Sequence, residues 1–200
     1  LISKNAPFDK FVAGDRNAIS QSAKNGLKIF IGKGHCVGCH NGPVFSDDNF
    51  HVIGLEIDTT LSPFAVPGET GRSANQALIC NPTVAGADFS VNGPYSDDRD
   101  TGRDGNFCSQ AIPDGLWRTK ELRHVAETAP YFRDGQAATL RDVVDFYDRG
   151  GDPTGTFIGG PKEIVPLHLS DCEKRDLIEF LETLTGEPVP AYKVADIHNP

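Results

Sequence analysis

The pentapeptide Cys36-Val37-Gly38-Cys39-His40 constrains this chain more than any other feature of its sequence. In a Cys-x-x-Cys-His motif the thiols are spaced so that they can add across the two vinyl groups of one haem, and the histidine then lies under the iron. We therefore predict one covalently bound haem c, with thioether bonds to Cys36 and Cys39 and with His40 as the proximal iron ligand. A fold with this motif is built around the macrocycle.

Two other kinds of site also use closely spaced cysteines. A structural zinc site takes four protein ligands, and no second Cys/His pair stands at a zinc-like spacing in this sequence. A redox-active Cys-x-x-Cys belongs to a strand-helix-strand context, which the residues around the motif lack. Haem is therefore the favoured interpretation.

Turn-forming residues are unusually frequent, since the 200 residues include 21 glycines and 14 prolines. Much of the backbone is therefore expected in turns and irregular segments. The length suits one domain, and a bound haem supplies the apolar core that a loop-rich chain lacks. The expected fold class is mainly α: a loop-rich c-type cytochrome domain with few short strands.

Charge and hydropathy narrow the choice of partners. The 19 basic and 28 acidic residues give a formal net charge of −9, which disfavours nucleic acid and favours basic or neutral proteins. No apolar run approaches the length of a membrane-spanning helix. Residues 1–10 lack the basic and apolar stretches of a signal peptide, so we expect a processed chain or part of a longer one.

Three cysteines lie outside the motif, at Cys80, Cys108 and Cys172. Haem is attached to thiols outside the cytoplasm, where disulfides also persist, so we expect a periplasmic or otherwise extracytoplasmic protein. Cys80 and Cys108 flank a stretch rich in Gly, Asp and Asn. We hypothesise a disulfide that closes this loop and stabilises it by roughly 3–4 kcal/mol. The alternative is that two or three of these thiols are free.

Apolar residues at helical spacing predict helices over 20–32, 139–149 and 170–185. Ser20 and Thr139 are the expected N-caps of the first two helices, and Ser170 opens a capping box at the third. A weaker helical pattern covers 116–128.

The remaining segments define the expected domain organisation. Residues 1–17 are expected to be an irregular lead-in or interdomain segment, and 18–186 to be the haem domain. Residues 41 to about 115 are dominated by Gly, Pro, Asp, Asn and Ser, and we expect this segment to be mostly loop. Residues 187–200 are a C-terminal tail.

The sixth iron ligand cannot be a methionine of this chain, because the chain contains none. The other candidates are nitrogen and oxygen ligands: His51, His124, His168, His198 and the four tyrosines. Tyr147 shares a helical stripe with Leu140, Val143 and Val144, so its ring is expected in the core, where a buried hydroxyl needs a partner. That partner is either ferric iron or a backbone group, and the residues alone leave the choice open.

Longer segments resemble one family. They include Gly26-Leu27-Lys28-Ile29-Phe30 before the motif, Asn41-Gly42-Pro43 after it, and above all Leu122-Arg123-His124-Val125-Ala126-Glu127-Thr128-Ala129-Pro130-Tyr131-Phe132-Arg133-Asp134-Gly135. With these segments the chain resembles the C-terminal haem half of the bacterial di-haem cytochrome c peroxidase and MauG family. The resemblance runs from start to finish except for about 73–115, which matches poorly and looks like a loop-rich insertion.

The resemblance implies several site residues. Tyr147 occupies the position where the peroxidases carry a methionine ligand and the MauG-like branch a tyrosine, so it is the expected distal iron ligand. His124 stands where the family usually has asparagine, and it is the alternative ligand. The family also binds calcium between its two haems, partly through backbone carbonyls that correspond here to Thr128 and Pro130.

The resemblance also implies a function. Family enzymes need two haems, and this chain has one motif, so it is not expected to be a complete peroxidase alone. We expect an electron-transfer half of a MauG-like or peroxidase-type oxidoreductase, which relays or stores oxidising equivalents. The second haem would lie on a partner chain or on a missing N-terminal half, and a redox partner protein would exchange electrons with them. The alternative is a freestanding mono-haem electron carrier without catalysis.

Overall fold

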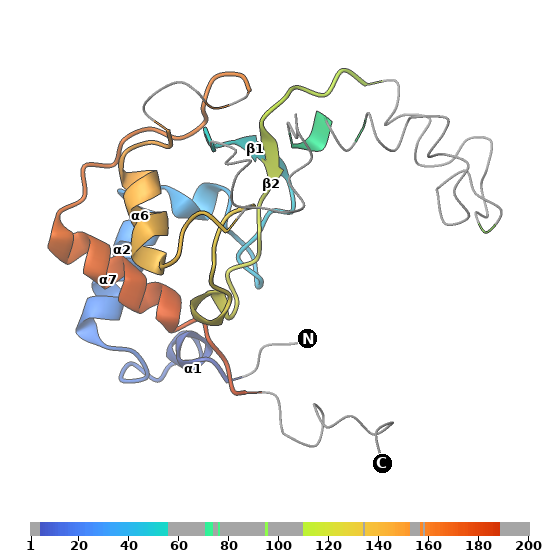
Figure 1. The fold of residues 1–200 in the computed structure, drawn as a ribbon. Coiled ribbons are helices and arrows are strands. Elements are labelled where there is room, and N and C mark those ends of the chain that lie inside the picture. The colour runs from blue at the N-terminus through green and yellow to red at the C-terminus, as the bar shows by residue number, and fades with distance from the viewer. Residues whose placement is uncertain are drawn as a thin grey trace, which may run out of the picture.

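The computed structural model describes residues 5–55, 71–73, 76, 95, 110–133, 135–152, 157 and 159–188. Its elements are, in chain order, α1 (Pro7–Val12), α2 (Gln21–Ile31), the short 3-10 helix η1 (Cys36–Gly38), β1 (Phe50–Val52), β2 (Leu116–Arg118), the 3-10 helix η2 (Val125–Glu127), α6 (Leu140–Asp148) and α7 (Asp171–Glu182) (Figure 1). This mainly helical, loop-rich domain with one two-stranded sheet confirms the predicted fold class. Among the described residues, no helix is both long and apolar enough to cross a membrane.

The core lies where α2 and α7 cross in close contact (Figure 1). Gly26 of α2 permits this approach, because a Cβ atom there would come within 1.9 Å of the Asp176 carbonyl oxygen on α7. Beside the crossing, the rings of Phe30, Phe45 and Phe180 pack with centroid separations between 5.1 and 6.4 Å. Burying each ring stabilises the fold by roughly 1.5–3 kcal/mol. This packing fixes the end of α2 from which the haem motif emerges.

The three predicted helices are confirmed close to their predicted bounds. Ser20, Thr139 and Ser170 cap α2, α6 and α7, and each side chain accepts a hydrogen bond from a backbone N–H three residues further on. Asp142 and Glu173 return the bond to the cap residue, which completes capping boxes at α6 and α7.

The lead-in over 1–17 is not irregular as predicted, because it contains α1. A proline at its start, Pro7, suits the first turn of a helix. The ring of Phe8 lies 5.5 Å from the rings of both Phe45 and Phe180. A helix this short is not stable alone. It forms because it packs on the core, which the local sequence pattern does not reveal.

The helix predicted over 116–128 was also wrong. Residues 116–118 form β2, which pairs antiparallel with β1 and sets Trp117 opposite His51. Only η2, near the end of the segment, is helical. Pairing with a strand distant in the sequence outweighed a weak local helical pattern, and tryptophan suits a strand.

Candidate functional site

The haem motif lies on one tight turn that follows α2. His35 adopts a left-handed backbone with φ of 52° immediately before η1. The backbone N–H of His40 donates to the Cys36 carbonyl over 2.8 Å. Gly34 leaves room for the turn, since a Cβ atom there would lie 3.1 Å from Cys36 Sγ. Both motif cysteines are free and partly buried, so two thiols and one imidazole share a single turn.

The thiols of the motif are held in the protonated form. Burial raises the pKa of Cys36 to about 11. The pKa of Cys39 is raised by burial and by the negative charges of Asp47 and Glu163. Redox-active and zinc-binding cysteines need the opposite shift, because the thiolate is both the nucleophile and the metal ligand. These raised pKa values mean that the two cysteines lack the activated thiolate of a thioredoxin-like site.

His40 is oriented by the backbone, because its Nδ1 lies 2.9 Å from the carbonyl oxygen of Phe45. When the Nδ1 hydrogen is donated to that oxygen, the lone pair of Nε2 is available to a metal, as in most metal-binding histidines. Phe45 reaches this position with φ of 58°, a left-handed conformation that costs an L-residue about 1 kcal/mol or more. Burial also lowers the pKa of His40, which keeps the ring in the neutral form that binds metals.

Tyr147 lies on α6, near enough to the two cysteines of the motif to interact with them electrostatically. Burial raises the pKa of its hydroxyl well above the usual value, and the nearby Cys36 and Cys39 add to the shift. Its ring packs against Phe146 and Phe132, with centroid separations of 5.4 and 6.4 Å. Within the described residues the Tyr147 hydroxyl has no hydrogen-bond partner. Of the two partners that the sequence allowed, a backbone group is therefore not found among these residues.

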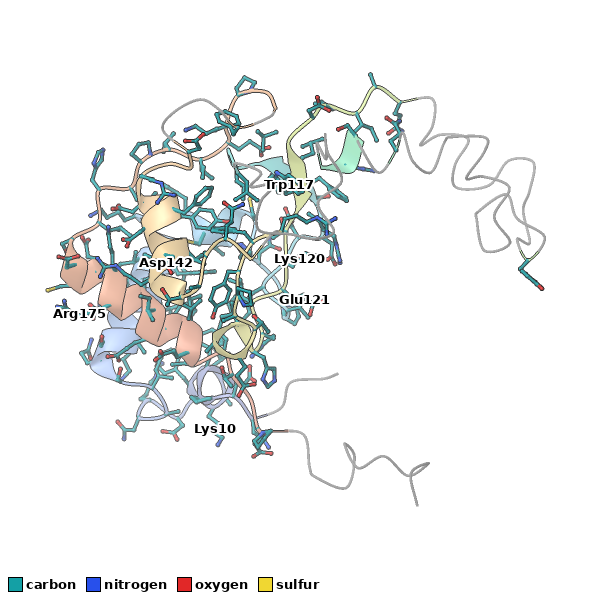
Figure 2. All side chains as sticks on the ribbon, in the orientation of Figure 1. Lys10, Trp117, Lys120, Glu121, Asp142 and Arg175 are labelled. Atoms are coloured by element: carbon teal, nitrogen blue, oxygen red, sulfur yellow. The ribbon has the colours of Figure 1, made fainter. Side chains whose placement is uncertain are left out.

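These residues fit a haem c. The two protonated thiols, the neutral imidazole and the unpartnered phenol hydroxyl lie on elements that meet beside the core. Trp117 adds another unpartnered group, because its indole Nε1 is buried and has no hydrogen-bond partner within the described residues. Trp117 lies on β2 (Figure 2). Because it pairs with His51 across the two strands, the two side chains share one face of the sheet.

The alternative distal ligand, His124, lies just before η2. Its Nδ1 is 3.1 Å from Glu127 Oε2, and its backbone N–H donates to the Leu184 carbonyl. His168 is exposed. His198 and the proposed Cys80–Cys108 disulfide fall outside the described residues.

The two calcium candidates lie on one surface segment after η2, and both are exposed. The Thr128 hydroxyl donates to the Val125 carbonyl over 3.1 Å. Within the described residues no hydrogen-bond donor reaches the carbonyl oxygens of Thr128 or Pro130. The iron-ligand and calcium assignments stay predictions.

The structure also brings together three residues that the sequence did not connect. His51 Nε2 lies 2.8 Å from Asp47 Oδ2, and His51 Nδ1 lies 2.7 Å from Glu163 Oε2. A ring nitrogen of His51, a carboxylate oxygen of Asp47 and Sγ of Cys39 all lie within 4.8 Å of one another. Glu163 is 112 residues away from His51 in the chain, so no local motif could have revealed this cluster.

The chain resembles known proteins in both its sequence and its fold. No protein-family model matches the chain. Cytochrome-c peroxidase IdrP2 of Denitromonas iodatirespirans is 36% identical over 196 residues, which cover 94% of this chain and 46% of the relative. Methylamine utilization protein MauG of Methylorubrum extorquens is 32% identical over 190 residues, which cover 94% of this chain and 41% of the relative. The chain thus spans about half the length of the curated relatives it matches.

Solved structures share the fold. The diheme peroxidase BthA from Burkholderia thailandensis aligns with a TM-score of 0.59 at 20% identity, over 91% of this chain and 46% of that one. A MauG-like protein associated with microbial copper homeostasis aligns with a TM-score of 0.58 at 23% identity, over 92% of this chain and 53% of that one.

Proposed function

Because the chain belongs to the family of bacterial cytochrome c peroxidases and MauG, we propose that it is the haem c electron-transfer half of such an oxidoreductase. The observation that carries the proposal is the nearness of Tyr147 to the motif. Tyr147 lies close enough to Cys36 and Cys39 for their charges to raise the pKa of its hydroxyl, and His40 beside them has Nδ1 bonded to the backbone.

The chain's own residues tune the iron in this proposal. A bound haem c supplies one-electron redox chemistry. His40 donates its Nδ1 hydrogen to the Phe45 carbonyl, which makes the ring a stronger electron donor. Tyr147 would provide an oxygen ligand, which favours ferric over ferrous iron. Because burial raises the pKa of its hydroxyl, Tyr147 gives up its proton only beside a positive charge.

The length of the relatives supports a two-part enzyme. Since this chain spans about half of them, the second haem belongs to a companion half, either the N-terminal part of the same protein or a separate chain. In this proposal 18–186 form the haem domain, which lies outside the cytoplasm because haem is attached to thiols there. The two haems would share oxidising equivalents and exchange them with a redox partner protein.

We extend the proposal to a calcium ion at Thr128 and Pro130. Both residues are exposed, and within the described residues their carbonyl oxygens accept no hydrogen bond. Calcium takes roughly six to eight oxygen ligands, so two carbonyls need oxygens from elsewhere. The companion half is the expected source.

Haem counting by native mass spectrometry, together with a pyridine haemochrome spectrum, tests the proposed function. We expect a c-type spectrum, one haem on this chain, and a second haem on the companion half in the purified assembly. A colourless, properly exported chain would exclude the haem assignment. A coloured chain that purifies as a lone mono-haem monomer, from cells that make the complete natural protein, would instead identify a freestanding carrier.

A further inference from the structure

His51 is enclosed between two carboxylates next to the haem attachment site. Asp47 lies on one side of the ring and Glu163 on the other, at 2.8 and 2.7 Å. The side chains of His51 and Asp47 are only 20% and 13% exposed, whereas that of Glu163 is 48% exposed. We call these three residues the Asp–His–Glu triad. With the imidazole protonated, the triad carries a net single negative charge.

The triad is an ion cluster and not a metal site. Both ring nitrogens of His51 are bonded to carboxylates, so the ring offers no free lone pair to a cation. The pKa shifts favour the charged form of each group, since the pKa of His51 is raised and the pKa values of Asp47 and Glu163 are lowered. For His51 the two carboxylates outweigh the opposing effect of burial.

The triad is attached to the haem-bearing segment by the backbone. The N–H of Asp47 donates to the Cys39 carbonyl over 2.9 Å. On the other side, Glu163 accepts from the Val52 N–H through its carboxylate and donates its own N–H to the Val52 carbonyl, both over 2.9 Å. These bonds fix the charges of the triad relative to Sγ of Cys39, from which the Asp47 carboxylate and a His51 ring nitrogen lie no more than 4.8 Å away.

We propose that Asp47 and His51 are positioning residues that set the electrostatic potential at the haem edge, Asp47 favouring the oxidised iron and His51 limiting that preference. The inference rests on the proposed function, because it requires a haem bound through Cys39. A negative charge near the iron stabilises the more positive oxidation state, and the partial burial of this pair reduces screening by solvent and salt. Asp47 therefore lowers the midpoint potential of the haem, and His51 raises it.

Two substitutions test this proposal in the haem-loaded protein, one that removes a negative charge and one that removes a positive charge. Asp47→Asn removes the anion, and we expect the midpoint potential to shift upward. His51→Gln removes the cation but keeps hydrogen-bonding groups, and we expect a downward shift. Potentials are measured by optical redox titration at low ionic strength and pH 6, where the remaining carboxylate partner keeps His51 protonated in the Asp47 variant.

Asp48→Asn is the matched control. Asp48 is the next residue, but its side chain is 59% exposed and is paired with Arg118, so its removal should leave the potential unchanged. Glu163→Gln should shift the potential upward by less than Asp47→Asn does, because Glu163 is more exposed. It also serves as the second variant if Asp47→Asn does not mature.

The sign pattern decides between electrostatics and mere packing. If the cluster only holds the fold together, both Asp47→Asn and His51→Gln loosen the haem site and shift the potential in one direction. Equal directions, or no shift in either variant, would overturn the proposal while a normal haem c spectrum leaves the proposed function intact. Loss of the haem signature from the unsubstituted protein would instead contradict the proposed function itself.

Discussion

At the scale of single residues, His40 and Tyr147, the two proposed iron ligands, are held in place by different means. His40 is oriented by a backbone carbonyl, which requires a left-handed conformation at Phe45. Tyr147 is held by the aromatic rings around it and has no hydrogen-bond partner within the described residues. Bonding to iron would give that hydroxyl a partner.

Replacing Tyr147 with Phe tests that role directly. We expect the ferric haem to change from the six-coordinate to the high-spin five-coordinate form, visible in optical and electron paramagnetic resonance spectra. The midpoint potential should rise, because an oxygen ligand that favours ferric iron is lost.

Tyr131→Phe is the control for the loss of a hydroxyl. The Tyr131 hydroxyl donates to the Val125 carbonyl over 3.0 Å, so its removal should cost about 1 kcal/mol of unfolding free energy and leave the spectrum unchanged. An unaltered spectrum for Tyr147→Phe would exclude Tyr147 as the ligand and return attention to His124.

The sequence predicted these residues unevenly. The haem motif was evident because its function depends on local spacing. Helix periodicity placed Tyr147 on the inner face of α6, but only the family resemblance singled it out as the expected iron ligand. Asp47 and Glu163 carried no such signal, since they meet only through loops far apart in the chain. The hydrogen bond that orients His40 could not be predicted either, because no sequence pattern indicates that Phe45 adopts a left-handed backbone.

At the scale of elements, helices that carry their own stop and start signals were predictable, and those that depend on partners were not. The capping residues of α2, α6 and α7 are read from neighbouring positions. In contrast, α1 is a short helix that depends on its contacts with the core, and β2 exists because β1 lies beside it. Tertiary contacts decided both of these elements.

The capping box of α7 gives the element-scale prediction. Glu173 accepts from the Ser170 backbone N–H over 2.7 Å and pairs with Lys33 at 2.9 Å. These contacts lower its pKa from the usual 4.5 to about 2. Because the folded-state pKa is the lower one, the stabilisation is present in full above about pH 4.5 and is lost as the pH falls toward 2.

Glu173→Gln keeps the shape of the capping box and removes the charge. We expect it to lose about 1 kcal/mol of unfolding free energy at pH 7, since partial exposure weakens the ion pair, and almost nothing near pH 2. Urea unfolding at several pH values measures the difference. Glu182→Gln, near the end of the same helix, is the control and should behave like the unsubstituted protein. A loss that is independent of pH would show that the charge does not matter.

At the scale of the whole molecule, the described residues pack around a hydrophobic core, whereas the proposed chemistry also needs a second haem. The rings and helices around Phe180 form that core. The chain matches only about half of its relatives, however, and in our proposal the second haem belongs to a companion half. The sequence alone indicated this division, because it contains one haem motif and a resemblance to proteins that need two.

The proposed calcium ion is the point where this division can be tested. Thr128 and Pro130 offer two exposed carbonyls, too few to hold calcium tightly.

We therefore expect the isolated chain to bind no calcium at micromolar concentration in isothermal titration calorimetry. The assembly with its companion half should contain about one tightly held ion by metal analysis. A chelator should then loosen the assembly and lower electron transfer between the two haems, and added calcium should restore both. Magnesium is the control, because it prefers smaller octahedral sites and should not substitute. A calcium-free assembly with normal inter-haem transfer would contradict the proposed calcium site. It would leave the proposed two-haem organisation intact, since that proposal depends on the haem count alone.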